Sequence, residues 1–171
     1  MRILFPLIAL AIILSCKVDK GGLTESEKNA FLEEIYNTDQ NFRFRASTIP
    51  DSSQEFKRLW DTIPKIDKRN FESISAFLKS NEYPDTINYS VKAAKAPWLV
   101  LQHTINVADR LAHYRYIKRG NEIGSVTDIQ LYLFLERTYY FDFGEQHEME
   151  NTFEKNYASR IPVYEKALGL D

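Results

Sequence analysis

Apolar residues recur every three or four positions along most of the chain, which is the spacing of a helix with one buried face. Phe31 and Ile35 follow this spacing in the first such segment, and Thr24 and Glu27 stand before them in the arrangement of a capping box. This helix is expected to run to about Ala46. Because no segment alternates apolar and polar residues as a half-buried strand does, the pattern predicts a single all-α domain of five or six helices.

The remaining helices are predicted from apolar periodicity and from the positions of proline and glycine. A second helix is expected to be interrupted at Pro64, and a third is expected to begin after Asp67, which can cap it. A long, largely apolar helix is expected over residues 97–119, with Gly120 in the position that follows a helix end. Two more helices are expected over residues 129–140 and, after a polar segment, over residues 161–169.

The beginning of the sequence has a different character. Arg2 precedes an apolar run of 12 residues, 3–14, which is shorter than the roughly 20 residues that span a bilayer. Its length is typical of the apolar core of a secretory signal peptide. The run ends in Ile-Leu-Ser-Cys, which resembles the lipobox of bacterial lipoproteins, with the small Ser15 before the acceptor Cys16. Cys16 is also the only cysteine, and acylation gives a lone cysteine in an exported protein a role.

We therefore expect a lipoprotein signal peptide over residues 1–15, a lipidated cysteine and polar tether over residues 16–22, and a helical domain over residues 23–171. The predicted location is the bacterial cell envelope, at the periplasmic or outer-membrane face. Acyl chains such as palmitate on Cys16 would be the membrane anchor. The alternative is that Cys16 is a buried residue near the start of an uncleaved membrane anchor.

Composition narrows the class of partner. Charged residues make up 27% of the 171 residues and hydrophobic residues 44%, which is usual for a soluble globular domain and excludes a disordered chain. The 22 basic and 24 acidic residues leave a net charge of −2, so no strong positive field favours a nucleic acid as partner. Arg110 and Arg115 are expected on a solvated helix face. A single cysteine excludes a disulfide framework and a cysteine-rich zinc site.

Polar residues interrupt three of the predicted apolar faces. Asp39 continues the apolar stripe of the first helix, and Arg43 follows it by one turn. Gln102 and His103 stand in the least polar segment of the chain, and Glu136 falls among hydrophobic residues of a later helix. Burying an ionisable group is costly unless it is paired, so these residues are expected to meet. The predicted cluster joins Asp39, Arg43, His103, Glu136 and Arg137, and Asp67, Asn70 and Gln102 can extend it.

Five segments follow one another in an order that is similar to that of a known family. They are Asp39-Gln-Asn-Phe-Arg43, Asp67-Lys-Arg-Asn70, Trp98-Leu-Val-Leu-Gln-His103, Leu135-Glu-Arg137 and Phe143-Gly-Glu-Gln146. These segments resemble the motifs D-Q-x-x-R, D-x-x-N, Q-H, D-R and Y-G-T-Q of an uncharacterised bacterial domain-of-unknown-function family that is common in exported proteins. The resemblance covers about residues 32–146. It implies a polar site that includes Gln40 and Gln146, and it implies no reaction. Glu136 and Glu145 depart from the aspartate and threonine of the family motifs.

The pattern favours a binding protein. We expect an exported lipoprotein that binds a small ligand or an envelope protein through a polar cleft near Gln102 and His103. A ligand site requires His103 to reach solvent in a concave pocket. The protein could instead be a structural or immunity-type lipoprotein, and that reading requires the polar network to be fully enclosed.

The second reading is a hydrolase-type enzyme. In it, His103 is the general base, and Asp39 or Glu136 orients its ring. Arg43 or Arg137 would then hold an anionic group of the substrate.

No cofactor is predicted. The segment His147-Glu-Met-Glu150 lacks the second histidine of the zinc motif H-E-x-x-H. A mixed site of Asp39, His103 and Glu136 could hold a divalent cation, but the neighbouring arginines would repel it, so no metal site is predicted. The sequence also has no phosphate-binding loop, dinucleotide fingerprint or serine nucleophile motif.

Overall fold

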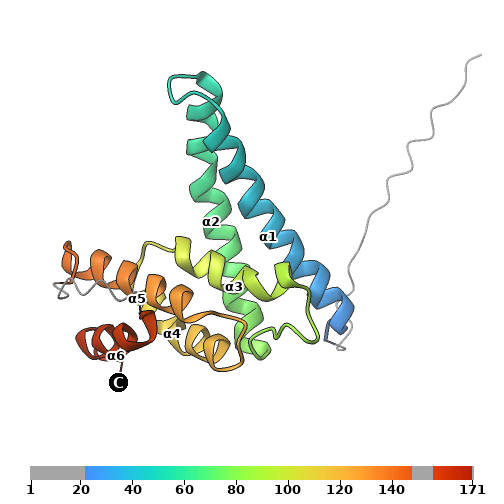
Figure 1. Cartoon of the computed structure of the whole chain (residues 1–171). Coiled ribbons are helices and arrows are strands. Elements are labelled where there is room, and N and C mark those ends of the chain that lie inside the picture. Colours follow the sequence, from blue (N-terminus) through green and yellow to red (C-terminus); the bar gives the residue numbers. More distant parts are fainter. Residues whose placement is uncertain (1–21, 148–155, 171) are drawn as a thin grey trace, which may run out of the picture.

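The computed structural model describes residues 22–147 and 156–170, and these residues form six α-helices and no strand (Figure 1). The helices are α1 (Glu25–Thr48), α2 (Gln54–Ser80), α3 (Val91–His103), α4 (Val107–Glu122), α5 (Asp128–Phe143) and α6 (Tyr157–Ala167). The expected all-α fold is confirmed. None of these helices is both long and apolar enough to cross a membrane. The predicted signal peptide and Cys16 lie outside the described residues.

The helices α1 and α2 form a long antiparallel hairpin, which projects beyond the other helices in Figure 1. The predicted capping box starts α1. The Thr24 backbone N–H donates to Glu27 Oε2 over 2.8 Å, and the Glu27 N–H donates to Thr24 Oγ1 over 3.3 Å. Ile35 of α1 and Ile63 and Ile66 of α2 are buried. Burial of these apolar side chains holds the two helices together.

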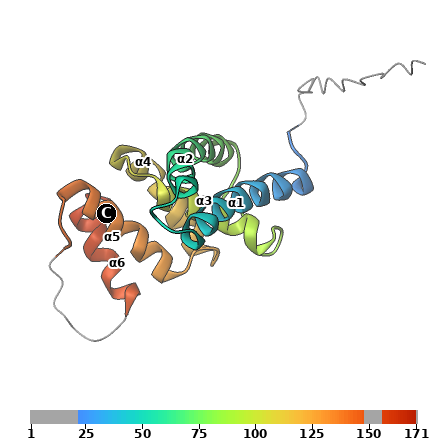
Figure 2. The same ribbon diagram turned by 90° about the horizontal axis from the view of Figure 1, so that it is seen from above.

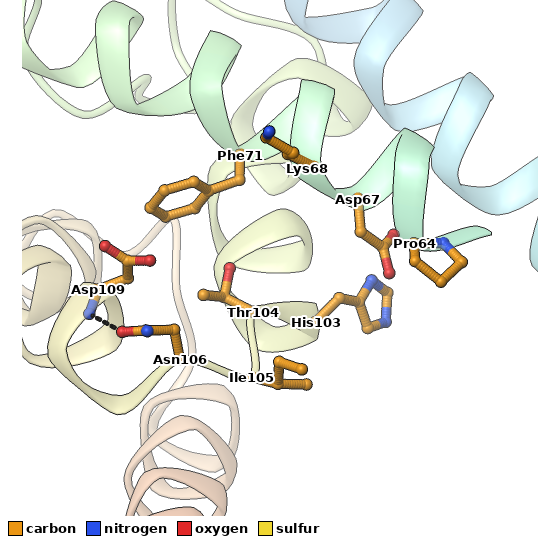
Figure 3. A pocket seen from close by; sticks show the side chains of 9 residues that line it. All are labelled: Pro64, Asp67, Lys68, Phe71, His103, Thr104, Ile105, Asn106 and Asp109. Atoms are coloured by element: carbon orange, nitrogen blue, oxygen red, sulfur yellow. Dashed lines mark hydrogen bonds between the residues drawn. The ribbon is translucent and has the colours of Figure 1, made fainter. Parts of the chain in front are cut away.

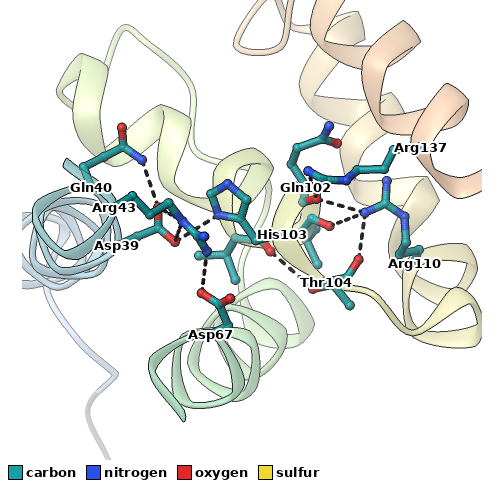
Figure 4. A network of polar contacts seen from close by, with 11 residues as sticks. Asp39, Gln40, Arg43, Asp67, Gln102, His103, Thr104, Arg110 and Arg137 are labelled. Atoms are coloured by element: carbon teal, nitrogen blue, oxygen red, sulfur yellow. Dashed lines mark hydrogen bonds and ion pairs between the residues drawn. The ribbon is translucent and has the colours of Figure 1, made fainter. Parts of the chain in front are cut away.

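The helix α3 lies across the base of this hairpin and packs on both α1 and α2 (Figure 1). It begins after Ser90, whose hydroxyl accepts a hydrogen bond from the Ala93 N–H. Ala93 and Ala96 are fully buried, and their small side chains let neighbouring helices approach closely. The C-terminal end of α3 is thereby brought against the hairpin, where Asp39 and Asp67 lie (Figure 4).

The C-terminal helices form a second group of packed elements. The helix α4 packs on α5 and α5 packs on α6, and Figure 2 shows α5 and α6 side by side and away from α1. Aromatic residues fill the contact between α5 and α6, where the ring of Tyr132 lies 5.7 Å from that of Tyr164. The Tyr114 hydroxyl donates to Glu165, which ties α6 to α4. Since α3 contacts both groups, it joins them.

The predicted helix boundary at Pro64 is wrong. The helix α2 continues through Pro64, and the expected third helix is the second half of α2. Proline removes one backbone hydrogen bond, here to the carbonyl of Trp60. Both residues are exposed, so water can solvate that carbonyl. Meanwhile the buried Ile63 and Ile66 hold α2 on the core.

The expected single helix over residues 97–119 is also wrong, because this segment belongs to two helices. The helix α3 ends at His103 and α4 starts at Val107. Asn106 begins the new helix, since its side chain accepts from the Asp109 N–H over 2.9 Å. The break places His103 at a helix end, beside the hairpin.

Gly120, expected to follow a helix end, lies inside α4. A Cβ atom at Gly120 would come within 2.8 Å of the Tyr83 ring and of Val126 Cγ2, so glycine is required for these residues to pack on α4. The helix α4 ends at Glu122, shortly before Gly124, whose φ of 77° suits a residue that follows a helix.

Candidate functional site

Asp39 is the centre of a polar network between α1, α2 and α3 (Figure 4). Its side chain is 1% exposed, and three side chains contact its carboxylate. Gln40 Nε2 donates over 2.9 Å and Arg43 Nε over 3.2 Å, and His103 Nδ1 lies 3.0 Å from Asp39 Oδ1. A buried carboxylate is costly without partners, and here one cation and two further polar groups compensate it.

The contact between Asp39 and His103 determines where the imidazole carries its proton. Burial raises the pKa of the Asp39 carboxyl, but the hydrogen bonds from His103 and Arg43 and the charge of Arg43 act in the opposite direction, and the pKa lies below its usual value. An ionised carboxylate only accepts hydrogen bonds, so Nδ1 of His103 must carry a proton. In the neutral ring the lone pair is then on Nε2, which has no hydrogen-bond partner in residues 22–147 and 156–170.

Arg43 links the two carboxylates of the network. Its Nη2 donates to Asp67 Oδ1 over 2.5 Å, while its Nε faces Asp39. The Arg43 and Asp67 side chains are 28% and 26% exposed, so this ion pair lies at the solvent edge of the network. Ion pairs at such an edge contribute little stability by themselves. The pairing does fix the position of the Asp67 carboxylate near the imidazole of His103.

A cleft of about 370 Å³ opens beside His103 (Figure 3). One wall comes from α2, and the other comes from the junction between α3 and α4. The lining residues are Pro64, Asp67, Lys68, Phe71, His103, Thr104, Ile105, Asn106 and Asp109. The His103 side chain is 19% exposed and borders this cleft. His103 therefore reaches solvent in a concave pocket, which is what a ligand site requires of it.

Arg110, expected on a solvated face, is instead completely buried in α4. Its Nη1 donates to the carbonyls of Leu101 and Thr104 over 2.9 Å and to the carbonyl of Gln102 over 3.2 Å. These are the carbonyls at and just beyond the end of α3, which a following helical turn would otherwise have satisfied. Arg110 thus stabilises the helix end that carries His103.

The other donors of Arg110 reach α5. Its Nε donates to Thr138 Oγ1 over 2.8 Å, and its Nη2 donates to the Phe134 carbonyl over 2.6 Å. The guanidinium carbon lies 4.3 Å from the centre of the Phe134 ring. In the described part of the chain no carboxylate pairs with Arg110. Burial, and then the charge of Arg137, lower the pKa of Arg110 to about 9.

The predicted cluster is divided in the structure. Asp39, Gln40, Arg43, Asp67 and His103 meet, whereas the two predicted residues of α5 do not contact them. Glu136 accepts a hydrogen bond from the Tyr132 hydroxyl over 2.9 Å, and Arg137 Nη1 donates to the Gln102 carbonyl over 3.2 Å. The reason is the packing of α5 on α4 and α6, away from the hairpin.

Three further predicted residues lie outside the network. Asn70 is buried, and its Nδ2 has no hydrogen-bond partner among the described residues. The Gln102 side chain turns to α5, where its Nε2 lies 3.4 Å from the Leu133 carbonyl and its buried Oε1 is unpaired within the same part of the chain. Gln146 is exposed, beyond the end of α5.

Sequence reasoning missed Arg110 and most of the cleft wall. Arg110 precedes the core residues Tyr114 and Ile117 by four and seven positions, so the helical spacing itself indicates burial. Phe71 and Asp109 carry no such signal. Their common cleft arises only because the middle of α2 faces the junction between α3 and α4.

The network also holds the donor types of a cation site. One ligand atom each from Asp39, Asp67 and His103 lie within 4.8 Å of one another. The third ligand of such a site would thus be Asp67, whereas the sequence suggested Glu136. Arg43 already pairs with both carboxylates, however, and its guanidinium supplies the positive charge that a divalent cation would bring.

Comparisons of the chain with protein-family models, with curated proteins and with solved structures found no match. The resemblance to the domain-of-unknown-function family therefore stays a prediction that rests on the five motifs.

Proposed function

We propose that this protein is a lipid-anchored protein of the bacterial cell envelope that binds a small ligand in the cleft beside His103. The observation that carries the proposal is the hydrogen bond between Asp39 and His103 Nδ1 at the border of a cleft, which leaves Nε2 without a partner among the described residues. Nε2 accepts a hydrogen bond from the ligand. Asp39 holds the ring in the orientation that this contact needs.

The exposure of the network supports ligand binding over a purely structural role. A network that only fixes helix packing gains from being enclosed, because water competes for its hydrogen bonds. Here the side chains of His103, Arg43 and Asp67 are all partly exposed. The cleft volume of about 370 Å³ is at the lower end of the range for small-molecule sites, so the ligand is of metabolite size.

A screen of small metabolites against the full chain tests this proposal. Compounds that raise the melting temperature would be compared on wild type, His103→Gln and His147→Gln. The second variant is a matched control, because His147 packs on Tyr139 and Tyr164 and does not line the cleft. We expect His103→Gln alone to lose the stabilisation by ligand. Equal stabilisation of wild type and His103→Gln by every compound would contradict the proposal.

A second candidate function, acid–base hydrolysis, is favoured by the same contact. A carboxylate that accepts from Nδ1 of a histidine is the arrangement that orients a general base in many hydrolases. In this function, Nε2 of His103 takes a proton from a water molecule as it attacks and returns it to the leaving group. Arg43 does not serve as the anion holder, because its donors face Asp39 and Asp67.

Chromogenic substrates separate the two functions. We would assay p-nitrophenyl acetate and p-nitrophenyl phosphate with wild type, His103→Gln and Asp39→Asn. Hydrolysis that both variants reduce at least about tenfold supports the enzyme. If a ligand binds and no hydrolysis depends on His103, the result supports the binding protein.

The anchor is tested apart from the cleft. Cells that express the full chain or its Cys16→Ser variant would be labelled with a palmitate analogue. We expect label on the wild-type protein, none on the variant, and release of the variant from the membrane fraction. Equal labelling and membrane association of both proteins would exclude Cys16 as the lipidated residue.

A further inference from the structure

The polar groups of the cleft differ in whether the protein already satisfies them. Asp67 is paired with Arg43, and the Thr104 hydroxyl donates to the Val100 carbonyl over 3.2 Å. Lys68 is 78% exposed and has Glu72 as its partner at 3.9 Å, so it extends toward solvent. These groups have little need of a ligand.

Two strong acceptors of the cleft are left without a partner in residues 22–147 and 156–170. One is Nε2 of His103, and the other is the carboxylate of Asp109. Asp109 stands in the first turn of α4, where the helix dipole favours a negative charge. Asn106 performs the capping of this helix, so the Asp109 carboxylate is not used for it and stays free.

The two acceptors lie at opposite ends of the cleft. In Figure 3, Asp109 and Phe71 form one end, and His103 and Asp67 form the other. Phe71 is half-buried, and its ring packs edge-on against His113, with the ring centres 5.2 Å apart. A carboxylate next to an aromatic ring attracts a cation through its charge and through the negative face of the ring.

We infer that the ligand of this cleft is a small amine, with its ammonium group between Asp109 and Phe71 and a hydroxyl or N–H at its other end. That second donor binds Nε2 of His103, and the Asn106 amide offers an N–H to a ligand oxygen. The inference rests on the proposed function, in which the cleft binds a ligand at His103. Arg43 neutralises Asp67 and Lys68 extends toward solvent, so the charge of Asp109 is the one that a ligand beside Phe71 meets, and an anionic ligand of the same size is disfavoured there.

Three sugars of one ring size test the charge. Glucosamine, glucose and glucuronate would be titrated into the full chain, and the amide resonances of cleft residues would be followed by NMR. We expect glucosamine to bind at least about tenfold more tightly than glucose, which is the usual weight of a charge-assisted hydrogen bond. Glucuronate is expected to bind most weakly.

Two asparagine variants locate the effect. Asp109→Asn is expected to remove the preference for glucosamine over glucose. Asp61→Asn is the matched control, because Asp61 is an exposed residue of α2 that does not line the cleft, and it should keep the preference.

The outcomes separate this inference from the proposed function. If glucose and glucosamine bind equally and His103→Gln abolishes both, the amine inference is wrong and the ligand site stands. A preference for glucuronate, or a preference for glucosamine that survives Asp109→Asn, also overturns the inference. So does the absence of any shift with glucosamine and with the smaller ethanolamine at about 10 mM, a concentration that would reveal even weak binding. If His103→Gln leaves the glucosamine affinity unchanged while Asp109→Asn lowers it, the amine is supported and the role proposed for His103 fails.

Discussion

Two arginines flank the end of α3, and they are satisfied in opposite ways. Arg43 pairs with two carboxylates at the solvent edge, next to an imidazole nitrogen that has no hydrogen-bond partner in residues 22–147 and 156–170. Arg110 is completely buried and donates only to carbonyls and to one hydroxyl. Charge compensates the first, whereas hydrogen bonds and the Phe134 ring compensate the second.

The difference shows where side chains can exchange one hydrogen-bond partner for another. They can do so around Arg43, and they cannot do so around Arg110. Around Arg43, the side chains are partly exposed, so water can take over their hydrogen bonds. Arg110, in contrast, is completely buried, and its donors serve four backbone carbonyls and the Thr138 hydroxyl. The two regions meet at residues 101–104, so the buried arginine supports the end of the helix that carries the exposed histidine.

The largest effect is expected from Arg110→Met. The methionine fills much of the space but removes the hydrogen bonds of the guanidinium, each of which contributes about 0.5–1.5 kcal/mol. It also leaves the Thr104 carbonyl without a partner in the described part of the chain, and an unsatisfied buried group costs about 1–3 kcal/mol. We expect a loss of about 4 kcal/mol in the free energy of unfolding, measured by urea titration. Arg110→Lys should lose less, because its ammonium can still donate to some of the same carbonyls.

Arg115→Met is the control for Arg110→Met. Arg115 is an exposed arginine of the same helix, so its loss should change stability by less than about 0.5 kcal/mol. A change of similar size in the two methionine variants would contradict the structural role given to Arg110.

A smaller effect is expected from Asp39→Ala. The substitution removes the acceptor of Arg43 and His103, but both partners are partly exposed and can turn to water, and Arg43 keeps Asp67. We therefore expect a loss of about 2 kcal/mol in the same titration. A loss as large as that of Arg110→Met would show that the network is a structural core, and the difference between the two regions would disappear.

The sequence predicted the central contacts of the site better than its surroundings. Asp39 and Arg43 share a face of one helix, and a polar His103 in an apolar segment needs a partner, so their meeting follows from local spacing and the cost of burial. Glu136 also interrupts an apolar helix face, but for a different reason. It lies on an apolar face that packs beside α6, where the Tyr132 hydroxyl satisfies it. Spacing shows that a polar residue is turned inward, but not which neighbour it meets.

The helix boundaries show the same limit. The capping box at Thr24 uses only residues three apart, and it forms as predicted. Pro64 and the break after His103 depend on tertiary surroundings. Exposure lets α2 continue through proline, and a distant arginine satisfies the end of α3. Residues 1–15 and Cys16 lie outside the described part of the chain, so their role stays a prediction.

The contribution of Asp39 to the free energy of unfolding should depend on pH. The folded pKa of Asp39 is lower than its ordinary value of 3.8, so the unfolded chain takes up the proton first as the pH falls. The stabilisation by ionised Asp39 is therefore complete above that ordinary value and is lost as the pH falls through the folded pKa. We expect the stability difference between wild type and Asp39→Asn to be constant near neutral pH and to shrink below about pH 4. A difference that grows on acidification would contradict the lowered pKa.

The smallest effect is expected from Glu136→Gln, which tests the division of the predicted cluster directly. Glutamine can still accept from the Tyr132 hydroxyl, so the free energy of unfolding should change by less than about 0.5 kcal/mol. The ¹⁵N resonances of the His103 ring, which report the proton on Nδ1, should stay the same, whereas Asp39→Asn should shift them. If Glu136→Gln shifts them as well, α5 is coupled to the network through Gln102 and Arg137. The region around Arg43 and the region around Arg110 would then form a single network. If only Asp39→Asn shifts them, the imidazole is controlled from the hairpin alone, and the network around Asp39 is independent of the buried arginine behind it.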